Sequence, residues 1–99
     1  MHRNVIWSPL SEIDLENTLT YLQKNWNDQV VNNFLDNIEN LIEQIAKNPK
    51  QFPLINKKRK VRKCVITKHN TIFYRVHKGS VELLRIFDNR QNPQKRKYE

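Results

Sequence analysis

The sequence has one glycine and one cysteine in 99 residues, and each shortage excludes a class of protein. A single glycine, Gly79, leaves no glycine-rich loop for cradling phosphates. A lone cysteine, Cys64, forms no intramolecular disulfide and builds no zinc cluster with other thiols. No apolar run approaches the roughly 20 residues of a membrane span, and the first ten residues lack a signal-peptide core. We therefore expect a cytoplasmic protein with neither metal nor cofactor and without contact to a membrane.

Negative charge is scarce in the second half of the chain. Residues 1–49 carry three Lys or Arg and seven Asp or Glu, a net charge of −4, whereas residues 50–99 carry fifteen and three, a net charge of +12. Solubility requires only mixed signs on the surface. The segregation predicts a basic surface, built from the second half, that faces nucleic acid or an acidic protein.

The first half predicts a short strand followed by two helices. Asn4–Trp7 is a β-type run, and Ser8-Pro9 reads as an N-cap with proline at the first helical position. The first helix carries one apolar stripe, formed by Leu15, Leu19, Leu22 and Trp26. A second helix, with Asp28 as its expected cap, ends at Asn48-Pro49 because the residue before proline disfavours helix. Its apolar face comprises Val30, Val31, Phe34, Leu35, Ile38, Leu41, Ile42 and Ile45.

The second half predicts three antiparallel strands after a loop at residues 49–60. The strands are expected at 61–67, 71–77 and 81–87, and Gly79 lies in the second turn, where positive φ is most useful. A chain of 99 residues makes one domain with one core. The expected fold is α+β in the order β-α-α-β-β-β, a helical hairpin packed on one face of a small, mainly antiparallel four-stranded sheet. The N-terminal strand lies at an edge, and residues 88–99 form a basic tail.

Basic side chains on the strands and the tail are the candidates for binding a target or a protein partner. Arginine is rarely placed on a sheet without an anion or a carboxylate to receive its planar fork. The charge run 57–60, by contrast, is most simply a solvated cluster. The predicted binding residues are Lys60, Arg62, Arg75, Arg85, Arg90, Lys95 and Arg96.

Cleavage of RNA by its own 2′-hydroxyl needs a base, an acid and a cation that stabilises the charged intermediate. The residues of this chain that match those roles are Arg62, His77, Arg90 and Tyr98. Cys64 is more simply a buried structural thiol than a nucleophile, because no histidine adjoins it in the sequence. Trp7 and Trp26 are expected at the rim of the core.

Several segments, in their order and spacing, resemble the RelE/ParE superfamily of type II toxin–antitoxin toxins. They are the opening Val5-Ile6-Trp7-Ser8-Pro9 with Asp14-Leu15, the paired helices, the Pro49–Pro53 linker, Val61-Arg62-Lys63, Thr71–Val76, and the ending from Leu84 through Arg85, Asp88 and Arg90 to Pro93. Each piece alone is weak, but together they span residues 5–93. The chain is closer to the ParE-like branch.

This resemblance implies a bacterial growth inhibitor held inactive in a hetero-oligomer with a small acidic antitoxin. ParE-like members are associated with inhibition of DNA gyrase, and RelE-like members with cleavage of ribosome-bound messenger RNA. Several nuclease-type relatives carry a histidine after the last strand where this chain has Asp88, which at neutral pH donates no proton. We therefore predict a gyrase-blocking toxin. A ribosome-dependent endoribonuclease is the alternative, and a module that only binds its antitoxin is a third possibility.

Overall fold

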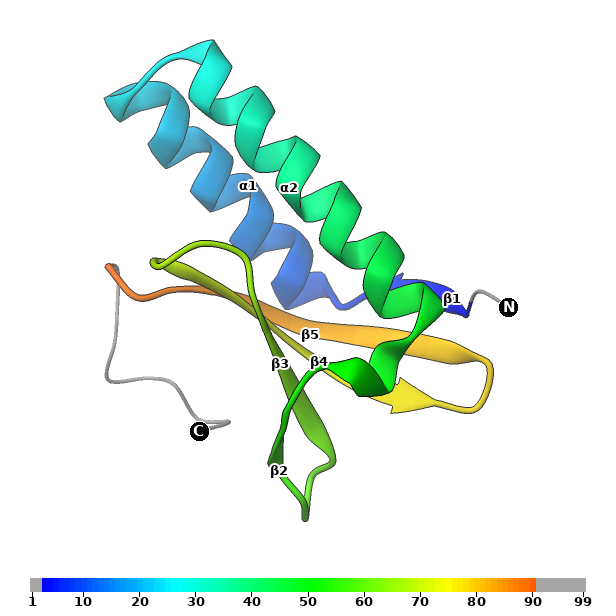
Figure 1. Cartoon of the computed structure of the whole chain (residues 1–99). Helices are drawn as coiled ribbons and strands as arrows, with labels where there is room; N and C mark the ends of the chain where they lie inside the picture. The colour runs from blue at the N-terminus through cyan, green and yellow to red at the C-terminus, as the bar shows by residue number, and fades with distance from the viewer. Residues whose placement is uncertain (1–2, 91–99) are drawn as a thin grey trace.

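The computed structural model describes residues 3–90 of the chain. Two helices form a hairpin on one face of a five-stranded sheet, whose strand order is β1-β5-β4-β3-β2 (Figure 1). The elements are β1 (Asn4–Trp7), α1 (Pro9–Asn25), α2 (Asp28–Lys47), the 3-10 turn η1 (Pro49–Gln51), β2 (Leu54–Asn56), β3 (Val61–Val65), β4 (Asn70–His77) and β5 (Ser80–Asp88). The predicted α+β class and the helical hairpin on one face are confirmed.

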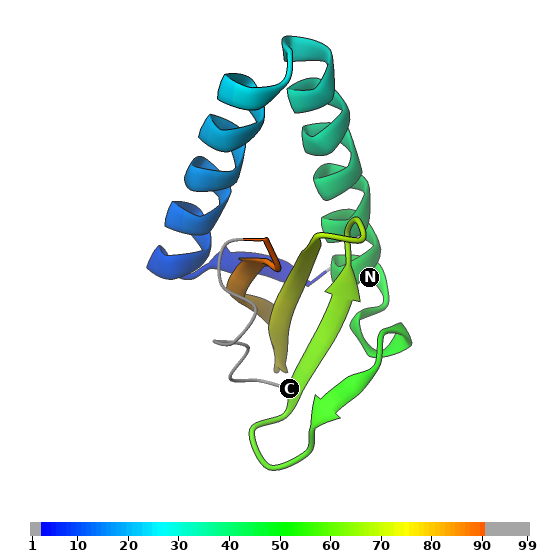
Figure 2. The same ribbon diagram turned by 90° about the vertical axis from the view of Figure 1, so that its left-hand side faces the viewer.

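The sheet has one strand more than the sequence predicts. β1 lies at one edge, parallel to β5, and the other neighbouring strands are antiparallel. The additional strand, β2, falls in the segment expected to be a loop and pairs with β3 at the other edge. Three residues beside Pro53 are too few to show a period of two, so the sequence pattern could not reveal them. The β2–β3 turn projects at the end of the sheet remote from the α1–α2 connection (Figure 2).

Each helix begins with a side-chain cap. The Ser8 hydroxyl accepts a hydrogen bond from the Ser11 amide at 3.0 Å and donates one to the Leu84 carbonyl at 2.8 Å, so it starts α1 and joins it to β5. In α2 the cap is Asn27, whose side chain accepts from the Val30 amide at 3.0 Å. The expected cap, Asp28, is instead the first helical residue, where its charge suits the helix dipole.

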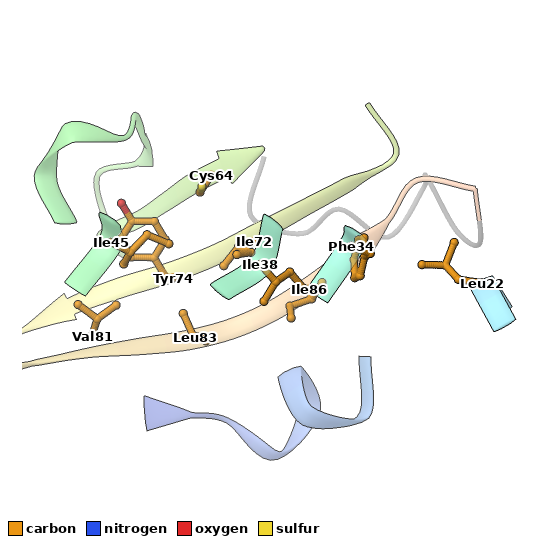
Figure 3. Packing of buried hydrophobic residues seen from close by; sticks show 10 residues of the cluster. All are labelled: Leu22, Phe34, Ile38, Ile45, Cys64, Ile72, Tyr74, Val81, Leu83 and Ile86. Carbon is orange, nitrogen blue, oxygen red and sulfur yellow. The ribbon is translucent and has the colours of Figure 1, made fainter. Parts of the chain in front are cut away.

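The main core lies between the helices and the sheet. Its buried residues are Leu22, Phe34, Ile38, Ile45, Cys64, Ile72, Tyr74, Val81, Leu83 and Ile86 (Figure 3). Burial raises the pKa of the Cys64 thiol to about 11, which makes it inert near neutral pH. Trp7 packs against this core, but Trp26 is 62% exposed and the expectation for it was wrong, because α1 ends one residue before it. Within residues 3–90, neither helix combines the length and apolar composition of a membrane span.

The opposite face of the sheet carries a second apolar cluster. Val61 and Phe73 are fully buried there and pack with Phe87, which is 8% exposed. Arg62 alternates with Val61 along β3, so it shares the helix-covered face with Cys64. Apolar side chains therefore occupy the centre of the face opposite the helices, and Arg62 is not among the side chains of that face.

Candidate functional site

A basic pocket of about 630 Å³ lies at the end of the sheet where β1 and β3 begin and β4 ends. Among residues 3–90, six of the nine lining residues are Lys or Arg, and none is Asp or Glu. The lining residues are Arg3, Lys50, Leu54, Lys57, Lys60, Arg62, Val76, His77 and Lys78. The pocket gathers cations from four separate segments of the chain, so the fold concentrates positive charge well beyond what the sequence run 57–60 provides.

The β2–β3 turn that supplies Lys57 and Lys60 is held at two points. The Asn56 side chain accepts a hydrogen bond from the Arg59 amide, and Arg75 donates from Nε to the Arg59 carbonyl, both at 2.9 Å. Lys60 has a φ of 59°, a left-handed backbone conformation that residues other than glycine and asparagine rarely adopt. The turn therefore holds the backbone of Lys60, at the edge of the pocket, in a conformation that glycine would adopt with less strain.

Arg62 is oriented by the backbone before any ligand arrives. Its Nη1 donates to the Phe52 carbonyl at 2.7 Å and to the Lys50 carbonyl at 3.3 Å. Among residues 3–90 these two bonds leave the Nε and Nη2 donors of Arg62 for another acceptor. A guanidinium fixed in this way retains donors in a planar fork that matches a phosphate or a carboxylate.

His77 lines the same pocket and contacts a carboxylate just outside it. Its Nε2 lies 2.9 Å from Oε1 of Glu82, and Nη1 of Arg75 lies 3.8 Å from the same oxygen. Glu82 therefore orients His77 and is an ion-pair neighbour of Arg75. Arg75, predicted as a binding residue, acts here as a brace for the turn and a neighbour of Glu82, and it does not line the pocket.

Arg85 is tied into the fold by α1. It donates to both carboxylate oxygens of Asp14, at 2.7 Å and 2.9 Å, and Asp14 also accepts from the Ile86 amide at 3.0 Å. The carboxylate is only 11% exposed, so it binds the strand and the arginine together in a sheltered position. The positive charge of Arg85 is already matched by Asp14.

Arg90 lies at the other end of the sheet from the basic pocket. It donates to both oxygens of Asp88, at 3.0 Å and 2.9 Å, and its guanidinium carbon sits 4.6 Å from the ring centre of Tyr21. Asp88 pairs with Asn70 at the start of β4, whereas His77 ends that strand. Seven residue steps along β4 separate the two ends by roughly 20 Å.

The candidate residues therefore divide into two groups. Lys60, Arg62 and His77 come together in the basic pocket. Outside it, Arg75, Arg85 and Arg90 have the carboxylates of Glu82, Asp14 and Asp88 as neighbours. Lys95, Arg96 and Tyr98 lie outside the described residues. Sequence reasoning missed Arg3, Lys50, Lys57 and Lys78 as parts of one site, although each directly flanks a predicted turn or element end. In the described part of the chain, no cluster of three His, Cys, Asp or Glu side chains is arranged to hold a metal.

The Asp88–Arg90 pair should make stability depend on pH. Burial alone would raise the pKa of Asp88, but the hydrogen bonds and charge of Arg90, with the charge of His69, bring that pKa below its ordinary value. Because the pKa of Asp88 is lower in the folded state than in the unfolded state, the ionised carboxylate stabilises the fold at pH values above its unfolded-state pKa. This stabilisation is lost as the pH falls through the folded-state pKa. We expect Asp88→Asn to lose about 1–3 kcal/mol near pH 7 and much less near pH 2.

Urea unfolding of both proteins at the two pH values measures this difference. Asp36→Asn is the matched control, because Asp36 lies exposed on α2. A stability difference between wild type and Asp88→Asn that is equal at both pH values would contradict a stabilising role for ionised Asp88 paired with Arg90.

Comparison with known proteins finds one family and a shared fold. The family model described as the ParE toxin of the type II toxin–antitoxin system parDE matches residues 5–93. A search of curated protein sequences finds no match. Among solved structures, the chain is similar to one from the chromosomal ParDE system of P. aeruginosa, with 13% identity, a TM-score of 0.74, and coverage of 88% of this chain and 96% of that one.

Two other solved structures have the same fold. A YoeB/ParE toxin from Agrobacterium tumefaciens has 20% identity and a TM-score of 0.61, and the match covers 86% of this chain and 97% of that one. A chain of the E. coli DinJ–YafQ toxin–antitoxin complex has 12% identity and a TM-score of 0.62, with coverage of 93% and 98%. At these identities the similarity establishes the fold alone.

Proposed function

The chain belongs to the ParE toxin family of type II toxin–antitoxin systems, and from this membership we propose that it arrests growth in the cytoplasm by binding and blocking DNA gyrase. The observation that carries the proposal is the basic pocket, whose lining residues in the described range 3–90 include six cations and no carboxylate. Such a site binds an anionic surface strongly and needs no catalytic step. We assign Lys60 and Arg62 the main contacts to the target.

The arrangement of charged groups favours blocking over cleavage. Arg90 lies roughly 20 Å of strand away from His77, so these two residues do not serve one reacting phosphate in this conformation. Asp88, which follows the last strand, is ion-paired and has a lowered pKa, so it is a carboxylate at neutral pH and has no proton to give. The described residues therefore offer binding groups without a complete acid and base pair.

We further propose that an acidic antitoxin neutralises the protein by covering the basic pocket in a hetero-oligomer. The similar DinJ–YafQ structure is a toxin–antitoxin complex, and the second half of this chain carries a net charge of +12. A partly disordered acidic segment folding onto this surface would relieve the repulsion among its cations. Affinity for the antitoxin should therefore fall as salt is added.

One observation favours messenger-RNA cleavage as a second candidate. His77 and Arg62 line the same pocket, and Glu82 orients the imidazole from 2.9 Å. A histidine braced by a carboxylate beside cations is a common arrangement for proton transfer at a phosphate. In that case His77 would act on the substrate, and Lys60 and Arg62 would hold its phosphate.

Two assays on the purified protein separate these candidates. We expect it to inhibit DNA supercoiling by gyrase and to leave ribosome-bound messenger RNA intact. Message cut at defined codons with supercoiling unaffected would overturn the gyrase proposal. Loss of that cleavage in His77→Gln, with an unchanged circular-dichroism spectrum, would then assign the reaction to the pocket.

A further inference from the structure

We propose that the basic pocket binds the consecutive phosphate groups of a nucleotide, either in a free nucleoside triphosphate or along a nucleic-acid strand. The inference deepens the proposed function, because it names the chemical group that the same pocket recognises. It does not require gyrase to be the target.

The charge balance of the pocket differs from that of the rest of the sheet. Three arginines elsewhere have carboxylate neighbours: Arg85 has Asp14, Arg90 has Asp88, and Arg75 has Glu82. Among residues 3–90, no carboxylate forms an ion pair with any of the six cations that line the pocket. The fold supplies carboxylates to those three arginines and none to the six pocket cations, so the pocket retains positive charge that an anion can neutralise.

The number and placement of the cations favour a phosphate chain over a single carboxylate. One carboxylate brings one negative charge, whereas two or three linked phosphates bring three or four. Arg62 is already aimed by two backbone carbonyls, and the left-handed turn fixes Lys60 nearby. A planar fork on one phosphate and mobile ammonium groups on the next would neutralise such a chain along its length.

The lining of the pocket indicates that the base of a nucleotide is not recognised. A volume of about 630 Å³ is within the range of nucleotide-sized ligand pockets. Within the described part of the chain, its apolar lining consists of Leu54 and Val76, and no Phe, Tyr or Trp is among the lining residues. Stacking on an aromatic ring is the usual way of holding a base. We therefore expect phosphate recognition with little preference among bases.

Titration calorimetry at constant ionic strength tests the inference with pyrophosphate, ATP, GTP, adenosine and a short single-stranded DNA. We expect pyrophosphate and both triphosphates to bind, with ATP and GTP within about threefold of each other, and adenosine not to bind. Lys57→Gln should weaken pyrophosphate binding by about tenfold. Lys58→Gln is the matched control, because Lys58 belongs to the same turn but does not line the pocket.

Lys60→Gly separates binding from folding. Glycine accepts a φ of 59° without strain, so the variant should keep or raise the melting temperature while pyrophosphate affinity falls by about tenfold. Tighter binding of the DNA than of ATP would assign the phosphates to a strand, and the reverse would assign them to a free nucleotide.

Three results would overturn the inference. The first is equal weakening of pyrophosphate binding by Lys57→Gln and Lys58→Gln. The second is binding of adenosine as tight as that of ATP. The third, from an added titration with poly-glutamate, is binding of that polymer with no binding of pyrophosphate. These titrations contain no gyrase. Absence of phosphate binding in them would therefore not contradict the gyrase proposal, which the supercoiling assay tests. Absence of gyrase inhibition would likewise not contradict phosphate binding.

Discussion

Replacing Phe34 by alanine is expected to lower the free energy of unfolding by about 3–5 kcal/mol. The ring is 5% exposed and lies in the main core, where α2 faces Ile72 and Ile86 of the sheet (Figure 3). Truncation removes its contacts and leaves a cavity that the packed strands cannot fill. Because a domain of this size is stable by only about 5–15 kcal/mol in total, the loss is large.

Urea unfolding at neutral pH measures the loss at Phe34. Asn33→Ala is the matched control, because Asn33 precedes Phe34 on the same helix and is exposed. We expect that change to stay within about 0.5 kcal/mol of wild type. A loss under about 1 kcal/mol for Phe34→Ala would mean that the helices do not cover the sheet as described.

Removing two charges from the basic pocket should abolish growth arrest. In the double variant Lys57→Gln and Lys60→Gln, each missing ammonium group costs about tenfold in binding to an anionic target, and because the two neighbours share that target, together they cost about ten- to a hundredfold. Both side chains are exposed, so the fold should be unaffected. Growth after induction without antitoxin, with protein level and circular dichroism monitored, measures the effect.

The matched control removes the same charge outside the pocket. Lys24 lies on α1 and Lys68 follows β3, and neither lines the pocket. The variant Lys24→Gln and Lys68→Gln should arrest growth as wild type does. Equal loss of toxicity in both double variants would mean that overall charge acts, and that the pocket has no special part.

The local signals in the sequence were sufficient for most of the fold. Ser8-Pro9 marks the start of α1, and Ser8 does cap it. Helical spacing placed Phe34, Ile38 and Ile45 in the core, where they are buried. The sequence did not predict β2, because pairing with β3 determines its conformation and three residues are too few to show a periodic pattern. Trp26 was misplaced because the apolar spacing continues one residue beyond the end of α1.

The site was harder to predict, because its parts meet through contacts between distant residues. Arg85 and Asp14 are 71 positions apart, so the sequence does not show that this strand arginine already has a carboxylate. Arg3 reaches the pocket because β1 pairs with β5, with the Asn4 amide donating to the Gly79 carbonyl at 3.2 Å. Charge density pointed to Lys60 and Arg62, but only the sheet topology brings Arg3, Lys50 and Lys78 to them.

The most direct test of the central claim, that the basic pocket blocks gyrase, is a supercoiling assay with three purified proteins. Wild type and the Lys24→Gln, Lys68→Gln variant should inhibit gyrase at similar concentrations. The Lys57→Gln, Lys60→Gln variant should need about ten- to a hundredfold more protein. Equal inhibition by all three would show that the pocket is not the surface that acts on gyrase, and no inhibition by wild type would show that gyrase is not the target.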